Sequence, residues 1–147
     1  ISFLLIGEGE KWIEAQHFQK TNNLINLKVI PFQSEDMLPH TMSLADIAIV
    51  SLNEGSEKFM VPSKMFYYMS AGAALIGICK EKSDVYDIIH NNNCGLTIEP
   101  RSPNELAALI KKLSKDLTKL QNLKYNSRSS ALSNFSRKVC TDKFIEE

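Results

Sequence analysis

The residues with the clearest chemical potential lie at the start of a short helical segment that reads Val61-Pro62-Ser63-Lys64. Pro62 suits the first turn of a helix, because its missing N–H group needs no partner there and its φ angle is already helical. Ser63 and Lys64 would then lie at the positive end of the helix dipole, where backbone N–H groups, a hydroxyl and an ammonium come together. This combination predicts a place that holds phosphate.

A second segment with possible chemistry is the turn Gly7-Glu8-Gly9-Glu10, which follows a short apolar run and leads into a helical stretch. The order strand, glycine turn, helix opens a Rossmann-like unit. The turn is not a dinucleotide fingerprint, because the third glycine of that motif would fall at Trp12. The sequence contains no P-loop motif either. The residues leave two interpretations open, a simple strand-to-helix connection or a contact to a bound ligand.

Apolar runs that read as strands alternate with helical patterns along the chain. The run from Ala73 to Cys79 shows no polar alternation, as expected of a parallel strand covered on both faces. Shorter strands are predicted at residues 3–6, 27–32, 47–50 and 96–98, and helices are predicted from about Ser34, Ser83 and Pro103. This alternation predicts an α/β fold with a Rossmann-like, mostly parallel sheet and helices on both faces.

Two helical segments have a predicted buried side. In the central helix, Met65, Phe66 and Met69 are spaced to form a core face, and Gly72 is a natural residue to end that helix. From Asp116 onward the chain reads as paired helices, whose predicted inward residues are Leu117, Leu120 and Leu123.

Composition excludes several classes of protein. At 147 residues the chain is long enough for one substantial core, and its 17 basic and 17 acidic residues create no general attraction to nucleic acid. Its three cysteines fit reduced thiols better than a disulfide framework. The histidines have no ligand spacing with each other or with a cysteine, so no metal site is predicted.

Several of these segments together resemble a known family. Residues 62–64 (PSK), then residues 68–72 (YMSAG) and a hydrophobic strand, are similar to the donor-binding half of retaining glycosyltransferases of the GT-B fold. These are the group 1, or family 4, enzymes that build bacterial surface polysaccharides. The similarity keeps its order and spacing through LLIGEGE, VIPF, ADIAIVSL and CGLTIEP, which begin at residues 4, 29, 45 and 94.

The resemblance implies a site for a nucleotide diphosphate-sugar that needs no metal ion or other cofactor. Gly7, Glu8 and Gly9 become candidates to contact the donor, and Pro62, Ser63 and Lys64 to hold its diphosphate. In this family the backbone at the end of the second strand lies against the nucleotide base. The candidates there are Val29, Ile30 and Pro31, although packing alone explains Val29 and Ile30 equally well.

The chain departs from the family where two glutamates are expected around the central helix. The second of these, which binds the ribose hydroxyls, aligns with Tyr67, and the first aligns with Phe59. A tyrosine hydroxyl cannot make the charge-assisted, bidentate contact that a carboxylate gives to a vicinal diol. We therefore expect weaker or different ribose binding. Glu57 could replace the first glutamate if the loop is shifted, but a solvated loop carboxylate is the favoured interpretation.

We predict a single nucleotide-sugar-binding domain over residues 1–147, with a sheet domain at 1–115 and C-terminal helices at 116–147. In the family another strand precedes Ile1 and an acceptor-binding domain precedes that strand, so the chain is interpreted as a fragment that lacks the first strand. Without that strand, the Phe3 strand must pair with the Ile47 strand, or else two edges stay exposed. Exposed edges favour self-association.

The leading hypothesis for the parent protein is transfer of a sugar from a nucleotide diphosphate-sugar to a glycan or lipid-linked acceptor. It would act in the cytoplasm, with peripheral attachment to the inner face of the membrane, and the isolated chain would be inactive. The alternative is a non-catalytic domain of the same fold that binds a sugar-nucleotide or a protein, which Tyr67 and Phe59 favour. A receiver-like domain fits the alternation but lacks a cluster of acidic residues.

Overall fold

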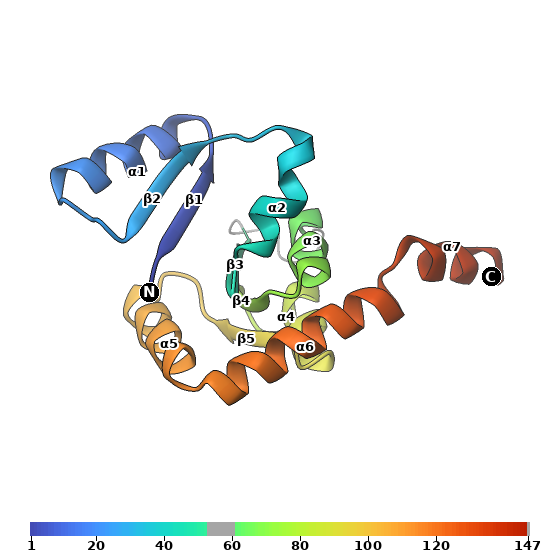
Figure 1. Cartoon of the computed structure of the whole chain (residues 1–147). Coiled ribbons are helices and arrows are strands. Elements are labelled where there is room, and N and C mark those ends of the chain that lie inside the picture. The colour runs from blue at the N-terminus through green and yellow to red at the C-terminus, as the bar shows by residue number, and fades with distance from the viewer. Residues whose placement is uncertain (53–60, 147) are drawn as a thin grey trace. The chain divides into compact units, whose positions relative to one another are not determined.

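The computed structural model describes residues 1–52 and 61–146 and shows an α/β fold built on parallel strands. The chain divides into two compact units, the N-terminal unit Ile1–Pro39 and the C-terminal unit His40–Glu147. Each unit has its own parallel sheet, with strand order β1-β2 in the first and β3-β4-β5 in the second (Figure 1). The predicted fold class is confirmed. The single domain with a boundary after residue 115 stays a prediction.

The N-terminal unit is a strand–helix–strand element. β1 (Phe3–Gly7) and β2 (Leu27–Pro31) pair in parallel, with Gly7 opposite Pro31 at their carboxyl ends. The connecting helix is α1 (Glu10–Thr21), which is tied to β2 by two side chains. The indole of Trp12 donates to the carbonyl of Ile30 at 2.8 Å, and the amide of Gln19 donates to that of Leu27 at 2.7 Å. The short helices η1 (Glu35–Met37) and α2 (Leu38–Ser43) follow.

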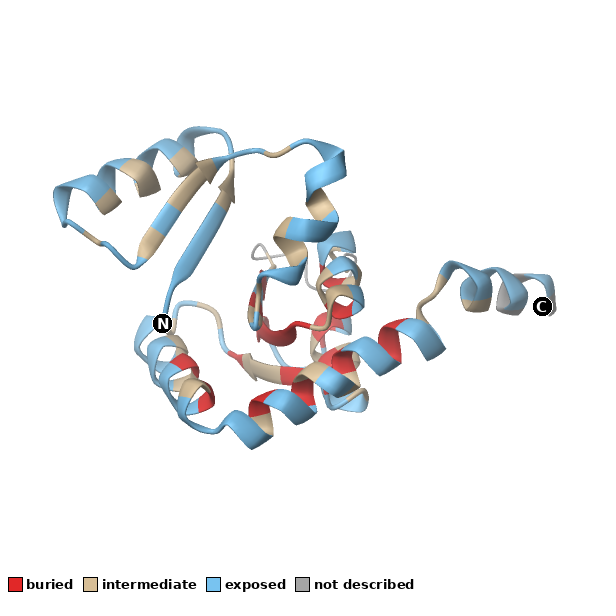
Figure 2. Ribbon diagram, viewed as in Figure 1, coloured by how far each residue is buried: buried red, intermediate tan, exposed pale blue. Residues whose placement is uncertain are grey.

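The N-terminal unit has no buried residue, as Figure 2 shows by the absence of red from β1, α1 and β2. The β1 side chains Phe3, Leu4 and Leu5 are apolar, yet each is 38–43% exposed, and they alternate between the two faces of the strand. In the described residues β1 pairs with β2 and β3 pairs with β4, so both β1 and β3 are edge strands.

The C-terminal unit surrounds a three-stranded sheet with helices. Its strands are β3 (Ile47–Ser51), β4 (Ala74–Ile78) and β5 (Gly95–Ile98). Its helices after α2 are α3 (Ser63–Ala71), α4 (Asp84–Asn91), α5 (Pro103–Lys115), α6 (Leu117–Asn134) and α7 (Arg137–Glu146). In Figure 1, α6 runs along the sheet and α7 continues beyond its end. The predicted strands and helices are all present, with ends shifted by one or two residues.

Both faces of this sheet are buried, because alternate residues of β4 belong to two separate hydrophobic clusters. The first cluster joins Leu75 to residues of β3, α3 and α4, including Ala48, Val50, Met65, Met69, Val85 and Ile89. The second joins Ala74 and Ile76 to residues of α5 and α6, namely Ile110, Leu113, Leu120 and Leu123. Each fully buried side chain of this size contributes about 1.5–3 kcal/mol. β4 is therefore the centre of the unit.

Close approach of β5 to β4 depends on a glycine. A Cβ atom added at Gly95 would lie only 2.2 Å from the carbonyl oxygen of Leu75, so no larger residue fits without moving the strand. Helix α4, which precedes β5, begins with a side-chain cap, since the Ser83 hydroxyl accepts a hydrogen bond from the N–H of Tyr86 at 3.2 Å. Ser83 is thus the cap of α4, a helix that the sequence predicted to begin at Ser83 or Asp84.

Two sequence predictions about helix starts need correction. Pro62 is not in the first turn of α3 but is the residue before it, since its ψ of 123° is extended and the helix begins at Ser63. Leu117 was predicted to face inward, yet it is 65% exposed because it begins α6 at the solvent, where Asp116 caps the helix through the N–H of Lys119. Leu120 and Leu123 are buried as predicted.

No helix in the described part of the chain combines the length and the apolar character needed to cross a membrane.

The cysteines provide a direct test of the core. Cys79 and Cys94 are buried and Cys140 is exposed. Burial raises the pKa of the Cys79 thiol, and it raises the pKa of Cys94 to about 11, so neither forms much thiolate near neutral pH. Titration with a disulfide reagent at pH 8 should show one fast thiol and two slow ones, and Cys140→Ser should remove the fast phase. Three equally fast thiols in the native protein would contradict the buried clusters.

Candidate functional site

The first turn of α3 carries the residues predicted to bind phosphate. The first N–H groups of any α-helix lack intrahelical acceptors, and the preceding residue, Pro62, provides no side-chain cap. The first turn of α3 also has no acidic residue, unlike the first turns of α1, α4 and α5. Ser63 and Lys64 are both exposed there. The Ser63 hydroxyl and the Lys64 ammonium therefore lie at the positive end of the α3 dipole, and the first turn of α3 has no carboxylate that would compete with a bound anion.

The inner side of α3 is fixed by the core. Met65 and Met69 are completely buried against the sheet, one turn apart. Phe66 lies half-buried on the flank of the helix, where its ring packs against that of Phe135, the residue directly after α6, with 5.0 Å between the centroids. These contacts leave the helix little freedom to rotate about its axis, so the exposed face that carries Ser63 and Lys64 is set by packing.

The far end of α3 closes with a left-handed residue, as predicted. Gly72 has φ of 80°, its N–H donates to the carbonyl of Met69, and the next N–H, that of Ala73, donates to Tyr68. This Schellman arrangement satisfies two of the last carbonyls of the helix. The guanidinium of Arg128 on α6 donates to another, the carbonyl of Ser70. α6 therefore supports α3 at its C-terminal end as well as along its flank.

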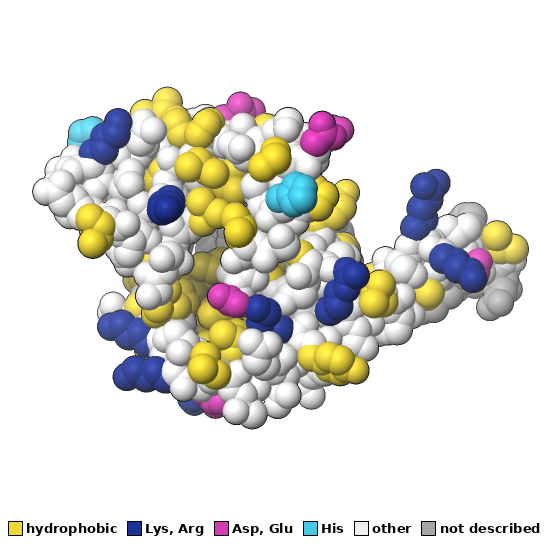
Figure 3. All heavy atoms as spheres, viewed as in Figure 1, with side chains coloured by type: hydrophobic (Ala, Val, Ile, Leu, Met, Phe, Trp, Pro, Cys, Tyr) yellow, Lys and Arg dark blue, Asp and Glu magenta, His cyan; other side chains and the backbone are white. Residues whose placement is uncertain are grey.

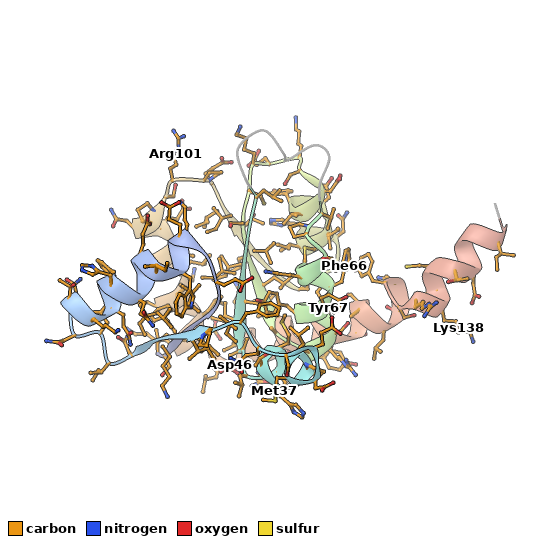
Figure 4. All side chains as sticks on the ribbon, turned by 90° about the horizontal axis from the view of Figure 1, so that it is seen from above. Met37, Asp46, Phe66, Tyr67, Arg101 and Lys138 are labelled. Carbon is orange, nitrogen blue, oxygen red and sulfur yellow. The ribbon has the colours of Figure 1, made fainter. Side chains whose placement is uncertain are left out.

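Tyr67 lies on the exposed face of α3, one turn after Ser63 and Lys64 (Figure 4). Its side chain is 62% exposed, so it is not a core residue. Its neighbour Tyr68 differs, because partial burial raises the pKa of the Tyr68 phenol. The structure therefore places Ser63, Lys64 and Tyr67 on one accessible surface of one helix.

The second group of predicted residues lies in the N-terminal unit. Gly7 is the last residue of β1, Glu8 and Gly9 follow the strand, and the strand register sets Gly7 opposite Pro31 and Ile6 opposite Ile30. The carboxyl ends of the two parallel strands thus meet, which is where α/β sheets bind ligands. The carbonyl of Ile30 already accepts a hydrogen bond from Trp12, and Val29 and Ile30 are partly buried, so packing also accounts for both.

The predicted site residues therefore form two groups, one within each unit: Gly7, Glu8, Gly9, Val29, Ile30 and Pro31 in the first, and Pro62, Ser63, Lys64 and Tyr67 in the second. Glu57 and the aligned position Phe59 lie outside the described residues. Among the described residues, no group of three histidine, cysteine or acidic side chains is arranged to hold a metal ion.

Sequence reasoning missed three residues that position these groups. Trp12 was interpreted only as an obstacle to a dinucleotide, whereas its indole holds α1 to β2. Arg128 and Phe135 were not connected with α3, because they lie about 60 positions away in the sequence and no local pattern relates them. Paired helices were predicted from Asp116 onward, but nothing in the sequence showed that one of them, α6, packs on α3.

The sequence model of the family described as "Glycosyl transferases group 1" matches residues 1–130, most of this chain. The chain belongs to this family. A related protein, the probable glycosyltransferase WbjE of Pseudomonas aeruginosa, is 29% identical over 104 residues. That alignment covers 70% of this chain and 25% of WbjE, so the chain corresponds to about a quarter of that relative's length.

Two solved structures of other proteins have the same fold as this chain. The chain superimposes on HepE of Anabaena in complex with UDP-glucose with a TM-score of 0.77 and 17% identity, covering 99% of this chain and 40% of HepE. For WaaG, a glycosyltransferase involved in lipopolysaccharide biosynthesis, the TM-score is 0.71 and the identity 14%, over 90% of this chain and 34% of WaaG. The group 1 glycosyltransferase domain is therefore shown by the family match, and its fold by these structures.

The turn after β1 can be tested by a matched pair of substitutions. Gly9 precedes α1 with φ of 94° and ψ of −175°, a conformation that is essentially restricted to glycine, whereas an added Cβ at Gly7 would meet nothing within 4 Å. Gly9→Ala should lower the free energy of unfolding of the N-terminal unit by about 1–3 kcal/mol, and Gly7→Ala by less than about 1 kcal/mol. The fluorescence of Trp12, the single tryptophan, reports on this unit during urea unfolding. Equal losses would contradict the strained turn.

Proposed function

We propose that this domain is the donor-binding part of a glycosyltransferase that moves a sugar from a nucleotide diphosphate-sugar to a glycan or lipid-linked acceptor in surface polysaccharide synthesis. The observation that carries the proposal is the family match over residues 1–130. It is supported by the fold shared with HepE, whose solved structures contain UDP-glucose or UDP. We place the parent protein in the cytoplasm, with peripheral attachment at the inner face of the membrane.

The chemistry assigned to α3 is binding and charge stabilisation. Breaking the bond between sugar and diphosphate leaves negative charge on the departing phosphate oxygen. The N–H groups at the start of α3, the Ser63 hydroxyl and the Lys64 ammonium would hold that charge, and because the core fixes α3 they need no rearrangement to do so. The proposal requires no metal ion and no other cofactor.

The phosphate role of Lys64 predicts a binding defect without a folding defect. Lys64 is exposed, so Lys64→Ala leaves the core intact and should leave the melting temperature almost unchanged. The same substitution should weaken UDP binding several-fold, as measured by calorimetry or by NMR titration. Lys111→Ala on α5, which removes the same charge from another exposed helix position, is the control and should bind UDP like the wild type.

Uridine provides the complementary measurement for Lys64. A wild-type protein that binds UDP no better than uridine has no phosphate site, and that result would overturn the role given to α3.

Tyr67 allows a test of ribose recognition, because it occupies the place of the family's ribose-binding glutamate. Its exposure means that substitution should not disturb the core. Tyr67→Glu should strengthen UDP binding and increase the preference for UDP over 2′-deoxy-UDP, since a carboxylate can accept from both ribose hydroxyls. Tyr67→Gln is the control, because glutamine has nearly the same shape as glutamate and carries no charge. If Tyr67→Glu binds both nucleotides exactly as Tyr67→Gln does, Tyr67 does not lie at the ribose.

We also propose that the chain self-associates through the open edge of β1. That strand has no charged residue to discourage pairing, its apolar side chains are exposed on both faces, and Figure 3 shows hydrophobic side chains at the surface of this unit. Light scattering after size exclusion should give a mass above 16.6 kDa, and Leu4→Lys should shift it toward the monomer. Leu132→Lys, at an exposed site on α6, is the control. A monomer at high concentration would refute the proposal.

A further inference from the structure

The helix that carries the candidate phosphate site is short, and its support comes from another part of the chain. α3 has 9 residues, which leaves few turns to resist a shift of its first turn. Packing of Met65 and Met69 on the sheet opposes movement toward or away from the core. Those two contacts do not oppose sliding along the surface of the sheet, because methionine side chains are flexible and adapt to small shifts.

Contacts from α6 supply the missing constraint. Arg128 donates from its guanidinium to the carbonyl of Ser70 in the last turn of α3. The stem of Arg128 also lies beside the end of the helix, since a Cβ atom at Gly72 would be 3.8 Å from the Cβ of Arg128. About one turn before Ser70, Phe66 packs on Phe135, the residue that directly follows α6. α6 therefore holds α3 at two points.

The hydrogen bond from Arg128 satisfies one carbonyl at the C-terminal end of α3. The Schellman arrangement at Gly72 uses the carbonyls of Tyr68 and Met69, and no backbone N–H of the described residues donates to the carbonyl of Ser70. A cation at this point also complements the negative end of the α3 dipole. Arg128 thus meets both the geometric and the electrostatic needs of the C-terminal end of α3.

We propose that Arg128 is a positioning residue for the phosphate site, acting through α3 rather than by contact with the ligand. This inference rests on the proposed function of Ser63 and Lys64. Direct attraction of phosphate by Arg128 is small, because a helix of this length spans about 13 Å at 1.5 Å per residue and charges are screened over about 8 Å at physiological ionic strength. What Arg128 controls is where the first turn of α3 lies.

NMR titration of the whole chain with UDP tests this proposal through three variants. Arg128→Met keeps the apolar stem and removes the donor, and it should weaken UDP binding about three- to tenfold while speeding hydrogen exchange of the amides in the last turn of α3. Arg128→Lys keeps a cation and a donor and should recover most of the affinity. Lys124→Met is the matched control, because Lys124 lies one turn earlier on α6 and pairs with Asp46 at 2.6 Å instead of contacting α3. It should bind UDP like the wild type.

The outcomes separate this inference from the function on which it rests. If the wild type binds UDP and the affinity of Arg128→Met is within twofold of the wild-type value, the positioning role is wrong and the phosphate site stands. The same conclusion follows if Lys124→Met loses as much affinity for UDP as Arg128→Met does. Failure of Arg128→Lys to recover affinity also contradicts it. If the wild type does not bind UDP, the proposed function fails and the positioning role fails with it. Should Arg128→Met not fold, Arg128→Ala and Arg128→Lys give the same comparison.

Discussion

The C-terminal unit depends on one strand that must be covered on both faces. Ala74, Leu75 and Ile76 of β4 are completely inaccessible, and they point alternately into the two hydrophobic clusters. A strand buried in this way needs helices above and below it, which α3 and α4 provide on one face and α5 and α6 on the other. The close fit at Gly95, where β5 meets the backbone of Leu75, shows how little space remains. The positions of β3, β5 and the helices α3 to α6 depend on this strand.

The placement of the candidate site is a consequence of that core. α3 precedes β4 directly, so the methionines that cover β4 also determine which face of α3 is exposed, and that face carries Ser63, Lys64 and Tyr67. The N-terminal unit differs, because two strands and one helix provide no buried residue, and structures of this size have marginal stability on their own. Its candidate residues are held by local hydrogen bonds, above all that of Trp12.

Much of this could be predicted from the sequence where one pattern dominates. The uninterrupted apolar run at β4, the glycine that ends α3 and the serine that caps α4 each have a local cause, and each was found. Contacts between distant positions were not, since nothing near Arg128 indicates that it meets Ser70. Leu117 was misassigned because periodicity alone does not show where a helix leaves the core. The exposure of Phe3 and Leu4 was also hidden, because an apolar strand looks the same in sequence whether or not both its faces are covered.

Tyr67 shows the limit of inference from family membership. The fold persists among solved structures at 14–17% identity, so shared architecture does not fix the residue at any one position. The account's central claim is that the first turn of α3 binds the diphosphate, and mapping UDP binding by amide chemical shifts tests it most directly. The account predicts that the amides of Ser63 and Lys64 shift with UDP and not with uridine. If the largest shifts fall elsewhere, or if uridine shifts these amides equally, the claim is contradicted.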